Sequence, residues 1–368
     1  MAVYLATMGL VALFGVVLCR EGDEKKSKVY VVLCFAVLTL IAAVRATTVG
    51  ADTSQFCRAY TYIGITPWGS LGDSFRYEWG FLVLCKMLNY ISSDPQFLLL
   101  VTSLLINVPI GIFIYRNSSK VELSIFLYLG LTCYTQNMNI MREAIAVSIV
   151  LIAFEVLKSH RAVGFALLVV LAASFHKTAL FLLILWPLWK LGFSRKTILI
   201  YCVISAFVFI FAQPISDVLA SLMGKDEIYN AKYTGSNYFG ALFKLLLALF
   251  ITFVVFNYFR VGQKRGIELT QIDRFYCHML MLWIMFSLLG MQIEIFARLC
   301  MYFNIFAVVG ITCAIRFIGN KGERAFVELL IGGIALCYFV VIGIYRPEWQ
   351  GAIPYEVGSS ILSFFKLM

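Results

Sequence analysis

Charged residues are scarce in this sequence: Asp, Glu, Lys and Arg make up 14% of the 368 residues, whereas 61% are hydrophobic. A water-soluble domain cannot bury that much apolar surface, so a soluble fold is excluded. The apolar runs are continuous and do not alternate with polar residues, which excludes a transmembrane β-barrel. The sequence therefore predicts an all-α, polytopic membrane protein.

Metal-ligand and disulfide patterns are also missing. The three histidines and ten cysteines show no zinc-type spacing, and no close acidic cluster is present, so we expect no metal and no cofactor. Most cysteines fall inside apolar runs, where they act as small hydrophobes, and only a Cys57–Cys85 disulfide is left open. The first apolar segment lacks a basic start and a cleavage site, which predicts a retained helix.

The stretch from Asn139 to Leu180 organises the chain. Two apolar segments meet at the basic turn 158–161; Arg142 opens the first segment and His176 closes the second. About 15 to 18 residues separate each polar group from the turn, roughly one bilayer crossing at 1.5 Å per residue. The two segments are therefore predicted to form a membrane hairpin that returns Arg142 and His176 to the same membrane face.

Basic residues orient the remaining apolar segments. With about 12 crossings, all six Lys/Arg-rich loops fall on one side, which is then cytoplasmic, and both termini lie outside. This holds only if 79–93 does not cross; it is short and carries Lys86, so we expect a re-entrant or interfacial helix there. The expected apolar segments are 2–19, 29–48, 97–115, 121–136, 141–158, 162–175, 178–190, 197–213, 239–259, 274–291, 298–316 and 326–345.

Two long loops, about 50–96 and 214–238, lie on the predicted outer face of a single integral membrane domain spanning 1–368. Both mix aromatic and acidic residues, with Tyr229 and Tyr233 in the second loop. Aromatic faces stack on the C–H faces of sugars and carboxylates bind sugar hydroxyls, so an outward-facing cleft for a glycan is one interpretation. An aromatic belt at the headgroup level is the other.

Five polar residues on this face are candidates for a site: Asp52, Glu78, Arg142, His176 and Arg298. Arginine binds phosphate through two parallel donors, and histidine transfers protons near neutral pH. A lipid diphosphate would need both. The alternatives are a snorkelling Arg142, an ion pair of Arg298 with Glu294, a structural turn histidine, and helix capping by the two acids.

The sequence also resembles a known family. Six short motifs occur in the order found in the EpsG-like branch of Wzy-type polysaccharide polymerases. In chain order they are VGADTSQF, YEWGFLVL, MREAIA, SFHKTAL one hairpin later, the tyrosine-rich YNAKYTGSNY, and ARLCMYF. The resemblance spans about 45–360 and carries Asp52, Glu78, Arg142, His176 and Arg298 over as recurrent polar positions. Glu143 replaces a common glutamine, and Trp79 a frequent proline.

The resemblance implies a glycosyltransferase that joins undecaprenyl-diphosphate-linked repeat units into O-antigen, capsule or exopolysaccharide at the outer, periplasmic face of the bacterial inner membrane. A GT-C-like architecture is one option for its fold. Expected partners are the lipid-linked glycans, membrane lipid, a chain-length regulator and a flippase, without nucleic acid. We expect His176, Arg142 and Arg298 to be catalytic and Asp52, Glu78, Tyr229 and Tyr233 to bind substrate. A lipid-linked oligosaccharide flippase and a membrane acyltransferase are the alternatives.

The charge pattern makes the orientation testable. Cysteine introduced at Ser54 or Tyr229 should react with a membrane-impermeant reagent added outside intact cells, because both positions lie in outer loops. Cysteine at Lys25 or Lys264 should react only after the cells are opened. Outside labelling of the Lys264→Cys variant would reverse the predicted orientation.

Overall fold

The computed structural model describes residues 1–19, 23–214 and 238–359, with the side chains of 238, 239, 294 and 295 left out. Two compact units divide the chain: Met1–Ile184 with Glu328–Met368, and Leu185–Val327. Within the described residues all regular structure is helical, apart from one isolated bridge between Arg45 and Val357.

Six helical spans are long and apolar enough to cross a bilayer: Glu24–Val44, Pro95–Asn117, Gly240–Lys264, Gln271–Leu289, Phe296–Ile315 and Lys321–Tyr345. Four shorter apolar helices accompany them: Ala2–Leu18, Trp79–Asn89, Val121–Gly130 and Ala162–Phe175. By length and composition the chain is therefore a multi-pass membrane protein. The number of about 12 crossings and the GT-C-like architecture remain predictions.

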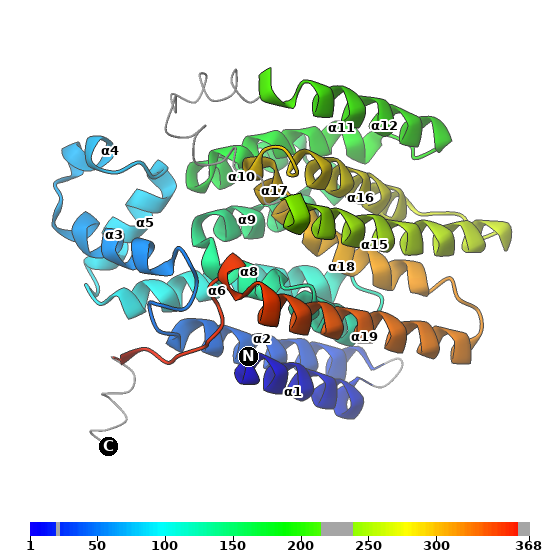
Figure 1. The fold of residues 1–368 in the computed structure, drawn as a ribbon, viewed down its shortest axis with the longest axis horizontal. Coiled ribbons are helices and arrows are strands. Elements are labelled where there is room, and N and C mark those ends of the chain that lie inside the picture. The colour runs from blue at the N-terminus through cyan, green and yellow to red at the C-terminus, as the bar shows by residue number, and fades with distance from the viewer. Residues whose placement is uncertain (20–22, 215–237, 360–368) are drawn as a thin grey trace. The chain divides into compact units, whose positions relative to one another are not determined.

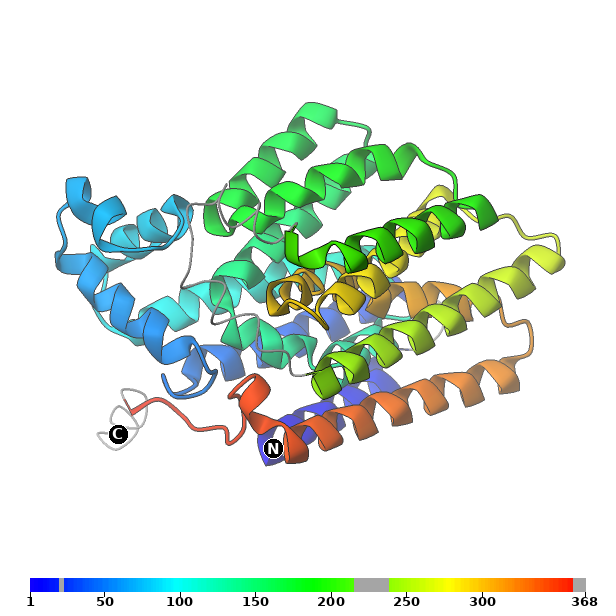
Figure 2. The ribbon, with the colours of Figure 1, turned by 45° about the horizontal axis from the view of Figure 1, so that its top comes forward.

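The first unit contains the predicted hairpin. Helix α9 (Met141–Lys158) and helix α10 (Ala162–Phe175) are joined by the basic turn, in which His160 adopts a positive φ of 56°. The two helices pack side by side (Figures 1 and 2). Helices α1 (Ala2–Leu18), α2 (Glu24–Val44), α6 (Pro95–Asn117), α7 (Val121–Gly130) and α8 (Cys133–Asn139) complete the bundle of this unit.

Two predicted segments are divided in the structure. The segment 121–136 forms α7 and α8, because Thr132 between them adopts a left-handed φ of 61° that stops a continuous helix. The segment 178–190 forms a 3₁₀ helix, η2 (Lys177–Ile184), and a short α11 (Leu185–Lys190). Pro187 has no N–H to donate to the carbonyl of Leu183, so one continuous α-helix over 178–190 would lack a hydrogen bond there.

The stretch 50–96, expected to be mainly loop, is largely helical. It holds α3 (Thr53–Ile65), the 3₁₀ turn η1 (Trp68–Ser70), α4 (Leu71–Ser74) and α5 (Trp79–Asn89), gathered near the start of α6 (Figure 1). Phe56, Tyr60 and Ile63 form the buried stripe of α3. Their spacing is that of one helix face. At 11 residues and about 1.5 Å per residue, α5 is too short to cross a bilayer.

Lys86 is buried inside this segment. Its ammonium group donates hydrogen bonds to the carbonyls of Ile63 (3.2 Å), Gly64 (2.8 Å) and Thr66 (2.7 Å) at the end of α3. A cation at a helix C-terminus satisfies carbonyls that have no partner within the helix. Lys86 therefore joins the C-terminal ends of α3 and α5, which run in parallel.

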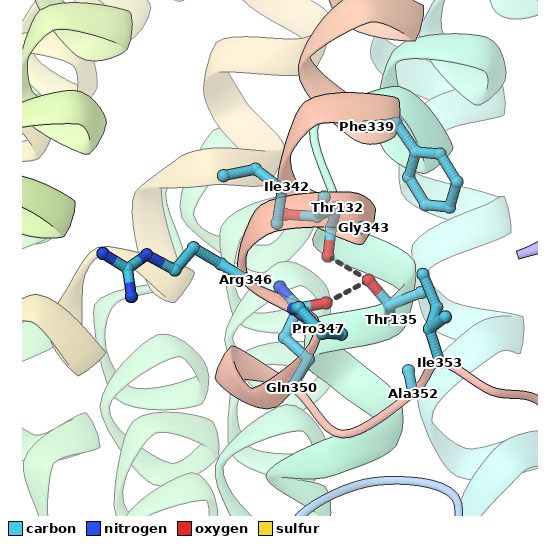
Figure 3. Close-up of a pocket in the computed structure, with 10 residues that line it drawn as sticks. All are labelled: Thr132, Thr135, Phe339, Ile342, Gly343, Arg346, Pro347, Gln350, Ala352 and Ile353. Carbon is cyan, nitrogen blue, oxygen red and sulfur yellow. Dashed lines mark hydrogen bonds between the residues drawn. The ribbon is translucent and has the colours of Figure 1, made fainter.

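The C-terminal segment after α19 (Lys321–Tyr345) returns to the loop that precedes α3. Gly50 and Ala51 donate backbone hydrogen bonds to the carbonyls of Gly351 (2.7 Å) and Gln350 (3.0 Å). Figure 3 shows Gln350 against Thr135 of α8, to which it is hydrogen-bonded, while the Arg346 side chain points away. Gly50 has a φ of 103°, which favours glycine, and an added Cβ would collide with Thr53 Oγ1.

A fully buried arginine joins two helix ends in the same unit. The guanidinium of Arg45, just after α2, donates to the carbonyl of Ala42 in the last turn of α2 and to that of Met138 in the last turn of α8 (3.0 Å for Met138). The next residue, Asn139, accepts a hydrogen bond from the backbone N–H of Asp52 at 2.8 Å. Arg45 and Asn139 thus fix the start of α3 against the end of α8.

The second unit contains α12 (Arg195–Ile210), α15 (Tyr238–Lys264), α16 (Gln271–Leu289), α17 (Glu294–Leu299) and α18 (Met301–Ile315). Asp273, buried at the start of α16, closes a capping box with Thr270 and pairs with Arg316 at 2.6 Å. His278 lies 3.0 Å from the hydroxyl of Tyr201. Both interactions are typical of helix packing and capping, and we assign them no catalytic role.

Candidate functional site

The structure brings together Glu78, Arg142 and His176 from three helix ends. Glu78 precedes α5, Arg142 is the second residue of α9, and His176 follows α10. Arg142 Nη1 forms an ion pair with Glu78 Oε2, and His176 Nδ1 lies 3.8 Å from Glu78 Oε1. One carboxylate therefore faces both the arginine and the histidine, and its side chain is only 7% exposed.

Glu143 extends this group. Its Oε2 lies 3.8 Å from His176 Nε2, so the imidazole stands between two carboxylates. Both separations fit an ion pair but exceed hydrogen-bond length. Sequence reasoning treated Glu143 only as a departure from the family pattern. The available signal was an acid inside an apolar helix, which by itself marks a candidate functional residue in a membrane protein.

Aromatic rings hold the guanidinium of Arg142 in place. Its central carbon lies 4.7 Å from the ring centre of Tyr77 and 5.6 Å from that of Phe56. These rings also pack against Phe81 of α5. Burial raises the pKa of the Tyr77 hydroxyl, and the charge of Arg142 opposes that rise. Arg142 is thus bound by stacking as well as by its ion pair.

The structure does not support side-chain capping as the role of Asp52 or Glu78. Both occupy N-cap positions, of α3 and α5, but neither side chain accepts a capping hydrogen bond. Glu78 pairs with Arg142 instead. The backbone N–H of Asp52 is hydrogen-bonded to Asn139, two residues before α9 begins, and its carboxylate contributes to raising the pKa of Tyr77. Asp52 therefore lies near the start of the helix that carries Arg142.

The other predicted residues are not part of this cluster in the first unit. Arg298 is partly buried in the short α17 of the second unit. The side chain of Glu294, its proposed ion-pair partner, lies outside the described side chains. Tyr229 and Tyr233 fall outside the described residues. Among the described residues no group of three His, Cys, Asp or Glu could hold a metal ion.

The site cluster is Glu78, Arg142, Glu143 and His176, with Tyr77 stacked on Arg142 and Asp52 nearby at the start of α3. It combines a permanent cation at a helix N-terminus, where anions are favoured, with an imidazole and two carboxylates. Such a set can bind an anion and move a proton next to it. Charges of both signs, with side chains only 3–20% exposed, are held in position before any ligand arrives.

These features define a multi-pass membrane protein with a charged cluster that suits anion binding and proton transfer. The sequence model of the EpsG family matches residues 28–357, and the chain belongs to that family. No curated protein and no solved structure matches the chain significantly. The EpsG family is associated with polysaccharide biosynthesis, which makes the protein a glycosyltransferase-type enzyme.

The ion pair between Glu78 and Arg142 should be energetically coupled. Glu78→Gln or Arg142→Met each leaves one partly buried charge unpaired and should destabilise the fold by about 2 kcal/mol. The double variant should lose less stability than the sum of both, because no unpaired charge remains. Thermal unfolding of the purified protein in detergent measures this, with the exposed Arg58→Met as control. Strict additivity would show that the two side chains do not interact.

Proposed function

We propose that this EpsG-family protein is a polymerase of lipid-linked oligosaccharide repeat units. It transfers a growing glycan from undecaprenyl diphosphate to a hydroxyl group of an incoming lipid-linked unit, at the outer face of the bacterial cytoplasmic membrane. The observation that supports this most is the site cluster. Its arginine suits a diphosphate, and its imidazole and carboxylates suit removal of a hydroxyl proton.

The reaction needs two kinds of assistance. The bond between the anomeric carbon and the diphosphate oxygen breaks, and the electron pair leaves with undecaprenyl diphosphate. A bond from the acceptor oxygen to the same carbon forms, and the acceptor hydroxyl loses its proton. The enzyme must therefore stabilise negative charge on the leaving diphosphate and accept a proton from the acceptor.

Arg142 is suited to the diphosphate. It lies in the first turn of α9, so the helix dipole adds to its charge, and stacking on Tyr77 and Phe56 limits its motion. Its Nε is buried and has no hydrogen-bond partner among the described residues, which leaves donor capacity on the guanidinium. A diphosphate bound here competes with Glu78 for Arg142 and so releases the Glu78 carboxylate.

That competition links leaving-group binding to proton transfer. Once Arg142 engages the diphosphate, Glu78 faces His176 alone, and this pair receives the acceptor proton, with Glu143 on the far side of the imidazole. Asp52 and Tyr77 then border the space for the acceptor sugar. From the sequence we also expect Arg298 to bind the diphosphate, and Tyr229 and Tyr233 to bind the glycan.

Arg142→Lys tests the diphosphate role. Lysine keeps the charge but loses the two parallel donors and the stacked plane, so polymer formation should fall about 30- to 1000-fold, or about 2–4 kcal/mol of transition-state stabilisation. The measurement is polymer ladder formation by purified protein supplied with lipid-linked repeat units. Arg58→Lys, exposed on α3, is the matched control. Near-normal turnover of a well-folded Arg142→Lys variant would remove the arginine from the chemistry.

His176 can be tested by comparing two substitutions. His176→Ala should nearly abolish polymer formation while donor binding persists, because the proton path through the imidazole is lost. His176→Gln retains hydrogen bonding but cannot transfer a proton, so it should be as inactive as the alanine variant. Substantial activity of the glutamine variant would make the histidine a phosphate ligand and leave Glu78 or Asp52 to accept the proton. Normal activity of both would reduce His176 to a turn residue.

A further inference from the structure

The far ends of α3 and α5 carry an exposed apolar surface that the site does not use. Its side chains are 38% exposed at Trp68 and up to 78% exposed at Ile65. We call this surface the apolar tip. Its members are Tyr62, Ile65, Trp68, Met87, Tyr90 and Ile91.

Hydrogen bonds make the tip one continuous surface. Trp68 Nε1 donates to the hydroxyl of Tyr90 at 2.9 Å, which joins η1 to the end of α5. Asn89 Nδ2 donates to the carbonyl of Tyr60 at 2.9 Å, and Lys86 caps the last turn of α3. The residues of the tip come from two stretches of sequence, but the fold holds those stretches against each other.

The tip contains no charge that meets solvent. Residues 59–72 and 87–93 include no Asp, Glu, Lys or Arg, and the ammonium of Lys86 between them is buried on backbone carbonyls. A segment that faces water normally carries charges, and a contiguous exposed apolar surface on a folded segment marks an interaction site. The absence of charge over both stretches points to an apolar or interfacial environment.

We propose that the apolar tip inserts into the boundary between headgroups and acyl chains of the phospholipid bilayer that the long helices cross. Three of its six members are Trp or Tyr, whose rings have an apolar body and a polar edge and are enriched at that depth. With 13 and 11 residues, α3 and α5 are too short to span the bilayer but long enough to lie in its interface. The buried stripe of α3 packs inward, so its opposite face is left for lipid.

The proposal stands without the polymerase function, but it affects the site. Both helices begin at the site cluster, with Asp52 before α3 and Glu78 before α5, and end at the tip. At 1.5 Å per residue, α3 spans about 20 Å. Insertion of the tip therefore sets how far the site cluster stands from the bilayer boundary.

Spin labels on the full-length protein in phosphatidylethanolamine–phosphatidylglycerol vesicles test the proposal. The labels are attached at Ile65→Cys and at Ile91→Cys, in a background in which the exposed Cys202 and Cys337 are serine. The control is Arg58→Cys, which lies seven residues before Ile65 on the same face of α3, two turns nearer the site. Collisions with oxygen, which concentrates in lipid, are compared with collisions with a water-soluble nickel chelate.

Both tip labels should collide more with oxygen than with nickel, and the label at position 58 should show the reverse preference. Nickel collisions at positions 65 and 91 as frequent as at position 58 would place the tip in water and overturn the proposal. Weak collisions with both reagents at the tip would show that a protein surface covers it, which also overturns the proposal. Unchanged thermal unfolding of each labelled variant confirms that the comparison concerns the native fold.

Discussion

The arrangement of the first unit depends on a buried positive charge. Arg45 is 1% exposed and forms no ion pair among the described residues; its guanidinium donates to carbonyls at the C-terminal ends of α2 and α8. An isolated buried cation is costly, but each helix end carries roughly half a negative charge, so two ends together offset it. Arg45 thereby links the end of α2 to the end of α8.

This constraint extends to the site cluster. The end of α8 fixes the start of α3 through Asn139 and Asp52, and Arg142 is the second residue of the next helix. The cluster thus holds its cation and its carboxylates in fixed positions, an arrangement that suits the proposed diphosphate binding. Glu78 is central because it balances Arg142 in the resting state and faces the imidazole with its other oxygen.

The sequence predicted the parts of the molecule that follow from length and periodicity. The hairpin of α9 and α10 was predicted because each apolar run is about one bilayer thickness long and is bounded by charged or polar residues. Helix α3 was missed because its apolar positions are interrupted by polar ones, although Phe56, Tyr60 and Ile63 have helical spacing. Thr132 was missed because threonine carries no sequence signal for a left-handed turn.

The candidate site was predicted only in part, for a related reason. Arg142, His176 and Glu78 stand at the ends of apolar runs, where single charges are conspicuous. The roles of Glu143 and Tyr77 depend on contacts with His176 and Arg142, 33 and 65 residues away along the chain, which spacing along one helix does not reveal. Arg45 was overlooked because its partners are backbone carbonyls of two helices, and backbone groups leave no trace in a sequence.

The pairing of residues 350–351 with residues 50–51 has a consequence for how the enzyme is made. These contacts join parts of the chain that are synthesised about 300 residues apart, tens of seconds at the usual rate of translation. Throughout that interval the helices enter the membrane while the loop before α3 lacks the segment that holds it. A chain that ends before residue 350 therefore lacks the backbone partners of Gly50 and Ala51, next to the start of α3.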